Sequence, residues 1–339
     1  MEHSNCKEKV EANMNKTRKI SSVLVTGGEG FIGFNISKLL SEKGYEVTVL
    51  DSENSMSGYN PFHRIMLEKL NVRIITDSIG NISKYDKQVK NAGAIINCAA
   101  LISHIDSMKN PILDIENNTI EQIKFISYVK QFQNKKIIYT STRQVYGRQE
   151  QLPVKETSAV NPMDSNGINK YTSELYYTLY SRIYSLNIII LRLTNIYGPG
   201  MHIKDKRLSF IGWFLNRCIT NNPIELYGNG LQKRDMLFVT DLCDTLYKAM
   251  LSDFKGIVNV GSDISLTLKD IAEIIKENNP KVNILKVSFP EEIKKIDIGN
   301  FYTDNTLAKK ILGHKENISI QEGIRVTIDY YNRYKGYYL

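Results

Sequence analysis

The sequence predicts an α/β protein built on a doubly wound parallel sheet. Two observations carry this prediction. Short apolar, β-branched runs alternate with helical patterns through the first 195 residues. The first of these runs, residues 20–26 (ISSVLVT), leads directly into the glycine-rich turn Gly27–Gly33 and then into a helical pattern that extends to about Lys43. Continuous apolar runs are typical of strands that helices cover on both faces.

The spacing of glycines in this turn suits the phosphates of a dinucleotide. Gly27 permits a tight turn, Gly30 lets the backbone approach a pyrophosphate, and Gly33 lets the helix pack closely on the strand. Phe31 and Ile32 complete the turn where the helix begins. We therefore predict a Rossmann-type domain that binds a dinucleotide.

A carboxylate that ends the next strand points to the kind of dinucleotide. Asp51 follows the strand predicted at residues 46–50 and lies eighteen positions beyond Gly33. A carboxylate at this place accepts hydrogen bonds from an adenosine ribose and repels a 2′-phosphate, so that NAD is favoured over NADP. The alternative is an ordinary surface aspartate at a strand end.

The length of 339 residues suits one large domain or two closely associated ones. The regular alternation of strands and helices becomes looser after residue 195, which indicates a second, smaller lobe. We divide the chain into a disordered lead-in at residues 1–19, an NAD-binding domain at 20–195, a partly interleaved substrate-binding lobe at 196–332 and a tail at 333–339.

Composition limits the possible partners and the compartment. The cysteines are scattered, without the spacing of a metal site or a disulfide framework, which fits a reducing cytoplasm. They are Cys6, Cys98, Cys218 and Cys243. No apolar run reaches the roughly 18 residues of a membrane span, so we expect no membrane partner. The net charge of +8 is spread along the chain without aromatic interleaving. This pattern favours polyanionic small substrates over nucleic acid.

The stretch at residues 140–174 indicates the chemistry. It reads TSTRQVYG, a loop, and NPMDSNGINKYTSE. Thr142 lies three residues before Val145-Tyr146-Gly147, and Lys170 lies in the helix that follows. This pair resembles the active site of the extended short-chain dehydrogenase/reductase family. That family contains the NAD-dependent nucleotide-sugar epimerases and dehydratases, with UDP-glucose 4-epimerase among them.

Later segments resemble the same family in the same order, from about residue 20 to residue 332. Residues 192–199 resemble its Arg-x-x-Asn-x-x-Gly-Pro segment, and residues 228–235 resemble its Gly-x-Gly-x-x-x-Arg-Asp segment. The resemblance implies NAD as cofactor, a nucleoside-diphosphate sugar as substrate, and a homodimer formed through helices near residues 112–133 and 170–184.

The resemblance also assigns roles to single residues. Those that it places at the cofactor, in addition to the glycine turn and Asp51, are Asp77, Ala99, Asn118 and Lys170. Those that it places at the diphosphate of the substrate are Asn195, Arg234 and Lys294, the last of which stands where the family usually has arginine.

The chain departs from the family at the proton acceptor. The family has a tyrosine four residues before the lysine, and this chain has Asn166. An amide has no useful basicity. Asp164, Tyr146, or Thr142 backed by Lys170 could take the proton instead. Two other interpretations remain: a step that needs no tyrosine base, or a binding protein without catalysis.

Arg143 and Gln144 bear on the type of reaction. In the family's dehydratases these two positions hold an aspartate and a glutamate, which protonate the leaving hydroxyl and remove the neighbouring proton. Neither Arg143 nor Gln144 can do this, although Arg143 could contact a carboxylate on the sugar or pair with a surface acid. The leading hypothesis is an NAD-dependent nucleotide-sugar epimerase that oxidises a ring hydroxyl transiently. The alternatives are a dehydratase or reductase of the same family, and a non-catalytic binding protein.

Overall fold

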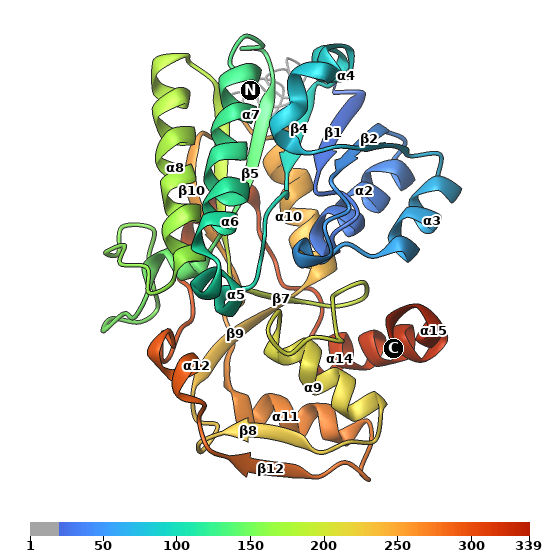
Figure 1. Cartoon of the computed structure of the whole chain (residues 1–339), viewed down its shortest axis with the longest axis vertical. Coiled ribbons are helices and arrows are strands. Elements are labelled where there is room, and N and C mark those ends of the chain that lie inside the picture. Colours follow the sequence, from blue (N-terminus) through green and yellow to red (C-terminus); the bar gives the residue numbers. More distant parts are fainter. Residues whose placement is uncertain (1–19) are drawn as a thin grey trace, which may run out of the picture.

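A seven-stranded parallel sheet forms the larger part of the protein in our computed structural model, which describes residues 20–339 (Figure 1). The predicted lead-in at residues 1–19 lies outside the described residues. The strand order is β10-β6-β5-β4-β1-β2-β3, with every pair parallel. The strands are β1 (Ser22–Thr26), β2 (Glu46–Asp51), β3 (Arg73–Thr76), β4 (Ala94–Asn97), β5 (Lys136–Thr142), β6 (Asn187–Leu193) and β10 (Gly256–Val260). The predicted doubly wound α/β fold is therefore confirmed.

The strand order reverses between β1 and β4, and this reversal locates the site. Thr26 is in register with Leu50 on one side and with Asn97 on the other. The residues after these strand ends therefore emerge at one edge of the sheet. Ligands of open α/β sheets bind at such a switch point, beyond the carboxyl ends of the strands.

Helices cover both faces of the sheet, as fully apolar strands require. Helices α2 and α10 pack on one face, and α7 and α8 pack on the other. The helices of this part are α2 (Phe31–Glu42), α3 (Pro61–Lys69), α4 (Asp86–Asn91), α5 (His104–Lys109), α6 (Pro111–Ile115), α7 (Glu121–Val129), α8 (Ser165–Ile183), α10 (Val239–Leu251) and α13 (Thr306–Leu312), with short 3-10 segments η1 (Ser55–Ser57), η2 (Ile79–Tyr85) and η4 (Arg143–Tyr146). Both α10 and β10 come from beyond residue 195, so the chain returns to the first sheet after entering the lobe.

The single helix predicted near residues 111–133 is interrupted. A π-helical turn, η3 (Glu116–Ile120), separates α6 from α7. Single π turns inside helices occur often at functional sites. Here the turn carries Asn117 and Asn118, which face different surroundings, as described below.

The smaller lobe lies below the sheet in Figure 1. Its core is formed by side chains of the lobe's helices and strands, with Phe62 of α3 at its border. Strand β9 pairs with β7 in parallel and with β11 antiparallel, and β8 pairs with β12 in parallel. The elements are β7 (Asn195–Tyr197), β8 (Ile224–Tyr227), β9 (Lys233–Phe238), β11 (Ser265–Thr267), β12 (Ile284–Val287), α9 (Phe210–Ile219), α11 (Leu268–Glu277), α12 (Glu291–Lys295), α14 (Ile320–Arg333) and α15 (Lys335–Tyr338).

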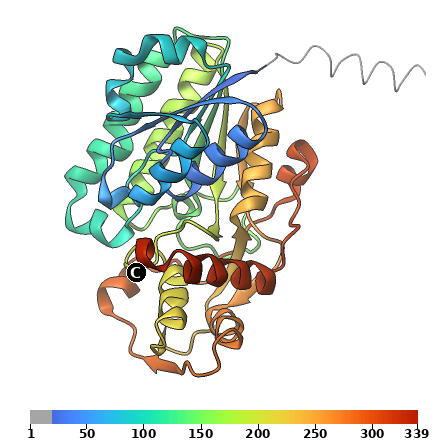
Figure 2. The same cartoon turned by 90° about the vertical axis from the view of Figure 1, so that its right-hand side faces the viewer.

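The residues of the predicted tail, 333–339, are folded against the first domain. Helix α14 runs across the molecule and leads to α15 near the C-terminus (Figure 2). Tyr338 is buried, and its hydroxyl lies 2.7 Å from Nε2 of His63. Nδ1 of His63 lies 2.7 Å from the backbone oxygen of Glu29. The C-terminus is thus connected through one imidazole to the glycine-rich turn.

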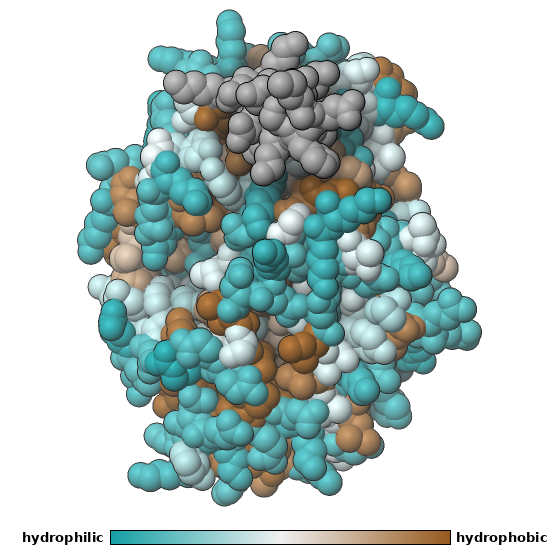
Figure 3. Space-filling view, turned by 180° about the vertical axis from the view of Figure 1, so that it is seen from behind, coloured by the Kyte–Doolittle hydropathy of each residue, from teal (hydrophilic) through white to brown (hydrophobic). Residues whose placement is uncertain are grey.

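Within residues 20–339, no helix combines the length and the apolar character that crossing a bilayer requires. The face opposite to that of Figure 1 is largely hydrophilic, with hydrophobic side chains in small groups (Figure 3).

We predict that His63 makes stability depend on pH. Burial lowers the pKa of His63 from 6.5 to about 4, so the folded state holds it neutral while the unfolded chain takes up a proton below pH 6.5. Its contribution to stability is complete above pH 6.5 and is lost as the pH falls toward 4, by about 3 kcal/mol. Urea unfolding of the wild type and of His63→Gln between pH 7 and pH 4.5 measures this loss.

The His63→Gln profile should be flatter than that of the wild type by this amount. Tyr337→Phe changes an exposed tyrosine of α15 and serves as the control, with a profile parallel to the wild type. Parallel profiles for the wild type and His63→Gln would contradict the prediction.

Candidate active site

The glycine-rich turn and the start of α2 form an anion cradle. Gly27 has φ +68°, and a Cβ there would lie 2.7 Å from the backbone nitrogen of Ala99. A Cβ on Gly33 would overlap the carbonyl of Gly27. The N-cap of α2 is Gly30, without a side-chain cap, and the first turn has no acidic residue. The amide groups at this end are therefore free of a competing carboxylate, as a pyrophosphate requires.

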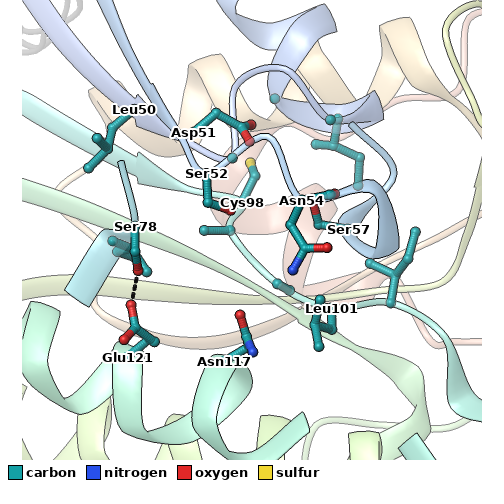
Figure 4. A pocket seen from close by; sticks show the side chains of 18 of the residues that line it. Leu50, Asp51, Ser52, Asn54, Ser57, Ser78, Cys98, Leu101, Asn117 and Glu121 are labelled. Carbon is teal, nitrogen blue, oxygen red and sulfur yellow. Dashed lines mark hydrogen bonds between the residues drawn. The ribbon is translucent and has the colours of Figure 1, made fainter. Parts of the chain in front are cut away.

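A cavity extends from this cradle along the ends of the strands (Figure 4). Asp51 lies in its wall and accepts hydrogen bonds from the backbone nitrogens of Glu29 (2.8 Å) and Glu53 (3.0 Å). Burial raises the pKa of Asp51, although these two bonds oppose the rise. The predicted cofactor residues in this wall are Gly27, Gly30, Phe31, Ile32, Gly33, Asp51, Asp77 and Ala99. These residues fit a dinucleotide with a free ribose 2′-hydroxyl.

The far end of this cavity is polar, and hydrogen bonds within the protein already hold its side chains in place. Ser78 and Glu121 are hydrogen-bonded to each other there, as the dashed line in Figure 4 shows. Partial burial raises the pKa of Asp77, but hydrogen bonds from Asn81, Tyr85 and the Ser78 backbone lower it to about 2. Asp77 therefore stays ionised, with most of its acceptor capacity used within the protein.

Asn118, which we predicted to meet the cofactor, does not line either cavity. Its amide is buried and bonds both the backbone nitrogen and the backbone oxygen of Leu101, each at 3.0 Å. It holds the loop that follows β4, while its neighbour Asn117 lines the cofactor cavity. The two roles differ because consecutive side chains of a helix point to different sides.

A second, larger cavity adjoins the first and opens toward the lobe. The two share wall residues at the start of α2 and in the loop after β4, among them Phe31, Ile32, Cys98 and Leu101. The predicted catalytic and substrate residues in the wall of the second cavity are Thr142, Arg143, Asn166, Lys170, Asn195 and Arg234. The structure therefore brings most of the predicted site together at the interface between the sheet and the lobe.

Lys170 and Thr142 both line the second cavity but come from different elements. Lys170 projects from α8, donates to the backbone oxygen of Thr140 (3.1 Å), and lies over the ring of Tyr139. Burial lowers the pKa of Lys170 to about 8, so it remains mostly cationic at neutral pH. Thr142 ends β5, and its hydroxyl accepts from the backbone nitrogen of Gln144 (3.2 Å). Its own proton remains available for a ligand oxygen.

Asn166 is committed to the protein scaffold. Its Nδ2 donates to the backbone oxygen of Leu101 (2.8 Å) and to Oδ2 of Asp114 (3.2 Å). Asn118 and Asn169 donate to the same carboxylate, at 3.0 and 2.8 Å. Asp114 is 2 % exposed, so three amides replace the water that a carboxylate needs. The sequence did not single out Asp114, because a lone aspartate in a helix gives no signal.

Arg143 faces the cavity without a carboxylate in direct contact. Its guanidinium donates to Oε1 of Gln144 and to Oδ1 of Asn195, both at 3.0 Å. Burial and the nearby charge of Arg234 lower the pKa of Arg143 to about 9. Within residues 20–339 it takes part in no ion pair, so a surface acid is not its partner.

Of the two cations predicted to bind a diphosphate, Arg234 lines the second cavity and Lys294 does not. Arg234 is 5 % exposed and lines the cavity, held by the backbone oxygens of Lys233 and Gly299 and by Asp297. Lys294 is not at the cavity, which corrects our prediction. Its ammonium lies 3.7 Å from Glu291 and its side chain is 63 % exposed, because α12 turns Ile293 inward instead.

Two predicted proton acceptors lie outside the cavity wall. Tyr146 is fully buried in a small apolar cluster, and its hydroxyl donates to Oδ1 of Asn259 (2.6 Å). Asp164 caps α8 by accepting from the backbone nitrogen of Gly167 (2.7 Å). Burial raises the pKa of Asp164, but its contacts with His104, Gly167 and Gln144 lower it overall. Neither group reaches a ligand directly.

Sequence reasoning missed other residues of the cavity wall. His104 begins α5, and Lys206 and Arg207 come from the loop before α9. A lone histidine and a short charge run give no pattern that distinguishes a wall residue from a surface residue. Only the folded loop after β4 and the crossing into the lobe bring them to the cavity.

Comparisons with known proteins show the family of this chain. Residues 23–261 match the model of the NAD dependent epimerase/dehydratase family. The chain belongs to this family. The expectation of NAD as cofactor and of an enzyme of this class is thereby confirmed.

The relatives and the solved structures cover nearly the whole chain. The chain is 28 % identical to a putative UDP-glucose 4-epimerase of Methanocaldococcus jannaschii, over 91 % of this chain and 97 % of that protein. The UDP-glucose 4-epimerase of Thermotoga maritima, solved with UDP-glucose, matches with TM-score 0.84 and 26 % identity over 93 % of this chain and 99 % of that one. The UDP-N-acetylglucosamine 4-epimerase of Methanobrevibacter ruminantium, in complex with UDP-N-acetylmuramic acid, matches with TM-score 0.83 and 26 % identity over 94 % and 100 %.

We predict that Asp51 makes the site selective for NAD over NADP. Asp51→Ala removes the charge that repels a 2′-phosphate, so the ratio of the two dissociation constants should fall at least about tenfold. Calorimetric titration with NADH and NADPH measures both constants. Glu42→Gln removes an equal charge from an exposed site at the end of α2 and should leave the ratio unchanged. An unchanged ratio in Asp51→Ala would contradict the prediction.

Proposed function

We propose that this protein is an NAD-dependent epimerase of nucleoside-diphosphate sugars that works by transient oxidation of a ring hydroxyl. The observation that carries the proposal is the pair of adjoining cavities. The first fits the dinucleotide, and the second combines Thr142 and Lys170 at one end with Arg234 at the other. NAD supplies a reversible hydride acceptor when bound. The hydroxyl of Thr142 would hold the sugar oxygen, and the Lys170 ammonium would stabilise negative charge that develops on it.

The charges of the second cavity favour epimerisation over dehydration. Eliminating water from a sugar needs an acid and a base beside the ring. Among the described residues of this wall, the acidic side chain is that of Asp297. Its carboxylate already binds the side chains of Arg234 (3.4 Å) and Gln232 (2.9 Å). The resemblance to the family's dehydratases places their aspartate and glutamate at the positions of Arg143 and Gln144, and both of these residues line the cavity. An oxidation followed by reduction needs only one proton acceptor, and it returns the cofactor to its first state.

Arg143 supports a substrate with an anionic substituent. Its guanidinium has neutral partners in the protein and lies at the cavity, where its fork can bind a carboxylate with two parallel bonds. Arg234 already serves the lobe side of the same cavity. We therefore expect acidic nucleotide sugars to be among the substrates.

We also propose a homodimer formed through α8 and α6, in the cytoplasm. Exposed apolar side chains form one stripe along α8, at spacings of four and seven residues: Ile168, Leu175, Leu179 and Ile183. Helix α6 lies beside it, with Ile112 66 % exposed. A second copy of this surface would bury these side chains. The described cysteines are free thiols, which supports a reducing compartment.

The first experiment follows the products of a panel of nucleotide sugars, neutral and acidic, incubated with the protein and NAD in heavy water. We expect an isomer of unchanged mass, because the hydride returns without exchange with solvent. Lys170→Ala should abolish this product, since the ammonium that stabilises the developing oxyanion is lost. Mass spectrometry after chromatographic separation is the measurement.

Other outcomes of this experiment would contradict epimerisation. Loss of water with gain of deuterium would mean dehydration. Loss of two hydrogens with accumulation of NADH would mean a net dehydrogenase. Binding without any product would mean a protein without catalysis.

The dimer is tested by Leu175→Glu combined with Leu179→Glu. Charges at the centre of an apolar contact would be buried without partners, so the variant should sediment as a monomer at concentrations where the wild type is a dimer. Lys87→Glu, on α4 away from this stripe, is the control. A wild type that sediments as a monomer would contradict this part of the proposal.

A further inference from the structure

The proposed epimerase needs a proton acceptor, and the candidates predicted from the sequence do not supply one. Asn166 is an amide bound to Asp114 and Leu101. Tyr146 is buried beside Asn259, and Asp164 lies behind the cavity wall. Thr142 has an accessible hydroxyl, but a threonine is itself far too weak a base. The group that receives the proton must therefore be another side chain of the same wall.

His104 is a wall residue with suitable chemistry. It is the first residue of α5, directly after the N-cap Ser103, and its side chain is 30 % exposed. The wall of the larger cavity contains it together with Thr142, Asn166 and Lys170. Histidine is the side chain whose basicity best suits proton transfer near neutral pH.

Asp164 holds one edge of this imidazole. Nδ1 of His104 is buried and lies 3.1 Å from Oδ2 of Asp164. The two atoms are within ion-pair distance but do not meet hydrogen-bond geometry, and contacts between catalytic groups are often poorly aligned before substrate binds. A carboxylate at this distance favours the tautomer with its proton on Nδ1, which leaves a lone pair on Nε2. Because Nδ1 is buried, the exposed part of the ring includes the opposite edge, which carries Nε2.

Asp164 is itself fixed by its surroundings. Its Oδ1 accepts from the backbone nitrogen of Gly167 at the start of α8, and its Oδ2 accepts from Nε2 of Gln144 (3.2 Å). Gln144 in turn accepts from Arg143 (3.0 Å). A chain of contacts therefore connects His104 through Asp164 and Gln144 to Arg143.

Among the charged groups on the elements packed against α5, the acid that contacts the imidazole of His104 is Asp164. Helix α8 contributes Asp164 and Lys170, and α6 contributes Asp114, whose carboxylate is occupied by three amides. From the loop before α9, Arg207 pairs with Asp106 of α5 at 2.8 Å. These contacts leave the imidazole facing the cavity on one side and Asp164 on the other.

We propose that His104, positioned by Asp164, accepts the proton of the sugar hydroxyl in place of the absent tyrosine. This inference rests on the proposed function. The O–H bond of the hydroxyl breaks, and its proton passes to Nε2. The hydride of the same carbon passes to an oxidised nicotinamide dinucleotide, so a ketone forms and the dinucleotide is reduced. Return of the hydride to the other face and of the proton from the imidazolium regenerates a hydroxyl of opposite configuration. The carboxylate of Asp164 stabilises the imidazolium meanwhile.

The test combines variants of both residues with chemical rescue. His104→Gln should lower kcat by about 100-fold or more, as removal of a general base does. Its affinity for the nucleotide sugar, measured by calorimetry, should remain within about threefold, as the base adds little ground-state binding. His104→Ala should regain activity when imidazole is added, whereas Lys170→Ala should not. Glu42→Gln changes an exposed side chain at the end of α2, away from both cavities, and should keep the activity.

A structural role for Asp164 is distinguished by Asp164→Asn, which still caps α8 but carries no charge. We expect the acidic limb of the pH–rate profile to move to lower pH, because the imidazolium loses its stabilising carboxylate. The C2-proton resonance of His104, followed by NMR over the same pH range, should show the same shift of its midpoint. This second readout does not depend on turnover.

Three results would overturn the inference alone. They are turnover by His104→Gln within tenfold of the wild type, loss of activity in His104→Ala that imidazole does not restore, and an unchanged His104 titration in Asp164→Asn. A wild type that converts no nucleotide sugar would remove the proposed function and this inference together. This outcome is distinguishable, because the first two results are read against an active wild type and the His104 titration is read by NMR without turnover.

Discussion

The buried carboxylate of Asp114 holds the active-site end of the molecule together. Three amide side chains bind it, from Asn118 on the π turn and from Asn166 and Asn169 on α8. Two of these amides also bind the backbone of Leu101, in the loop after β4. A helix, a π turn and a cavity-lining loop are thus connected through one charge. Loss of partners around a buried charge typically costs about 3–5 kcal/mol, so each amide is constrained by the others.

This constraint gives a physical account of the asparagine at position 166. A phenol at that position could not donate two hydrogen bonds, as Asn166 does to Leu101 and Asp114. The position has become part of the scaffold, and the chemistry must be carried elsewhere. The cavity wall then has a cationic character, with Lys170, Arg143 and Arg234 all in surroundings that lower their pKa. Such a wall suits anionic substrates and stabilises an oxyanion as it develops.

Much of the fold follows from local sequence. The strands predicted at residues 20–26 and 46–50 are observed as β1 and β2, and the glycine turn needs its glycines for reasons of backbone sterics alone. The return of β10 and α10 to the first sheet and the π turn at residues 116–120 do not follow from local patterns. Both depend on packing between segments far apart in the sequence. The folded C-terminus is a similar case, because Tyr338 gains its partner His63 only in the tertiary structure.

The sequence by itself determined the family, the dinucleotide cradle and six residues of the wall of the second cavity. It could do so because strand, turn and helix lie next to one another in the chain, and their spacing controls which side chains emerge at the sheet edge. The tertiary structure decided which of the predicted side chains reach the cavity and which other side chains contact them. It turned Asn118 and Lys294 away from the cavity and placed Asp164 behind His104. Side-chain direction at a helix end or in a long loop depends on what packs against it, and that information is absent from local spacing.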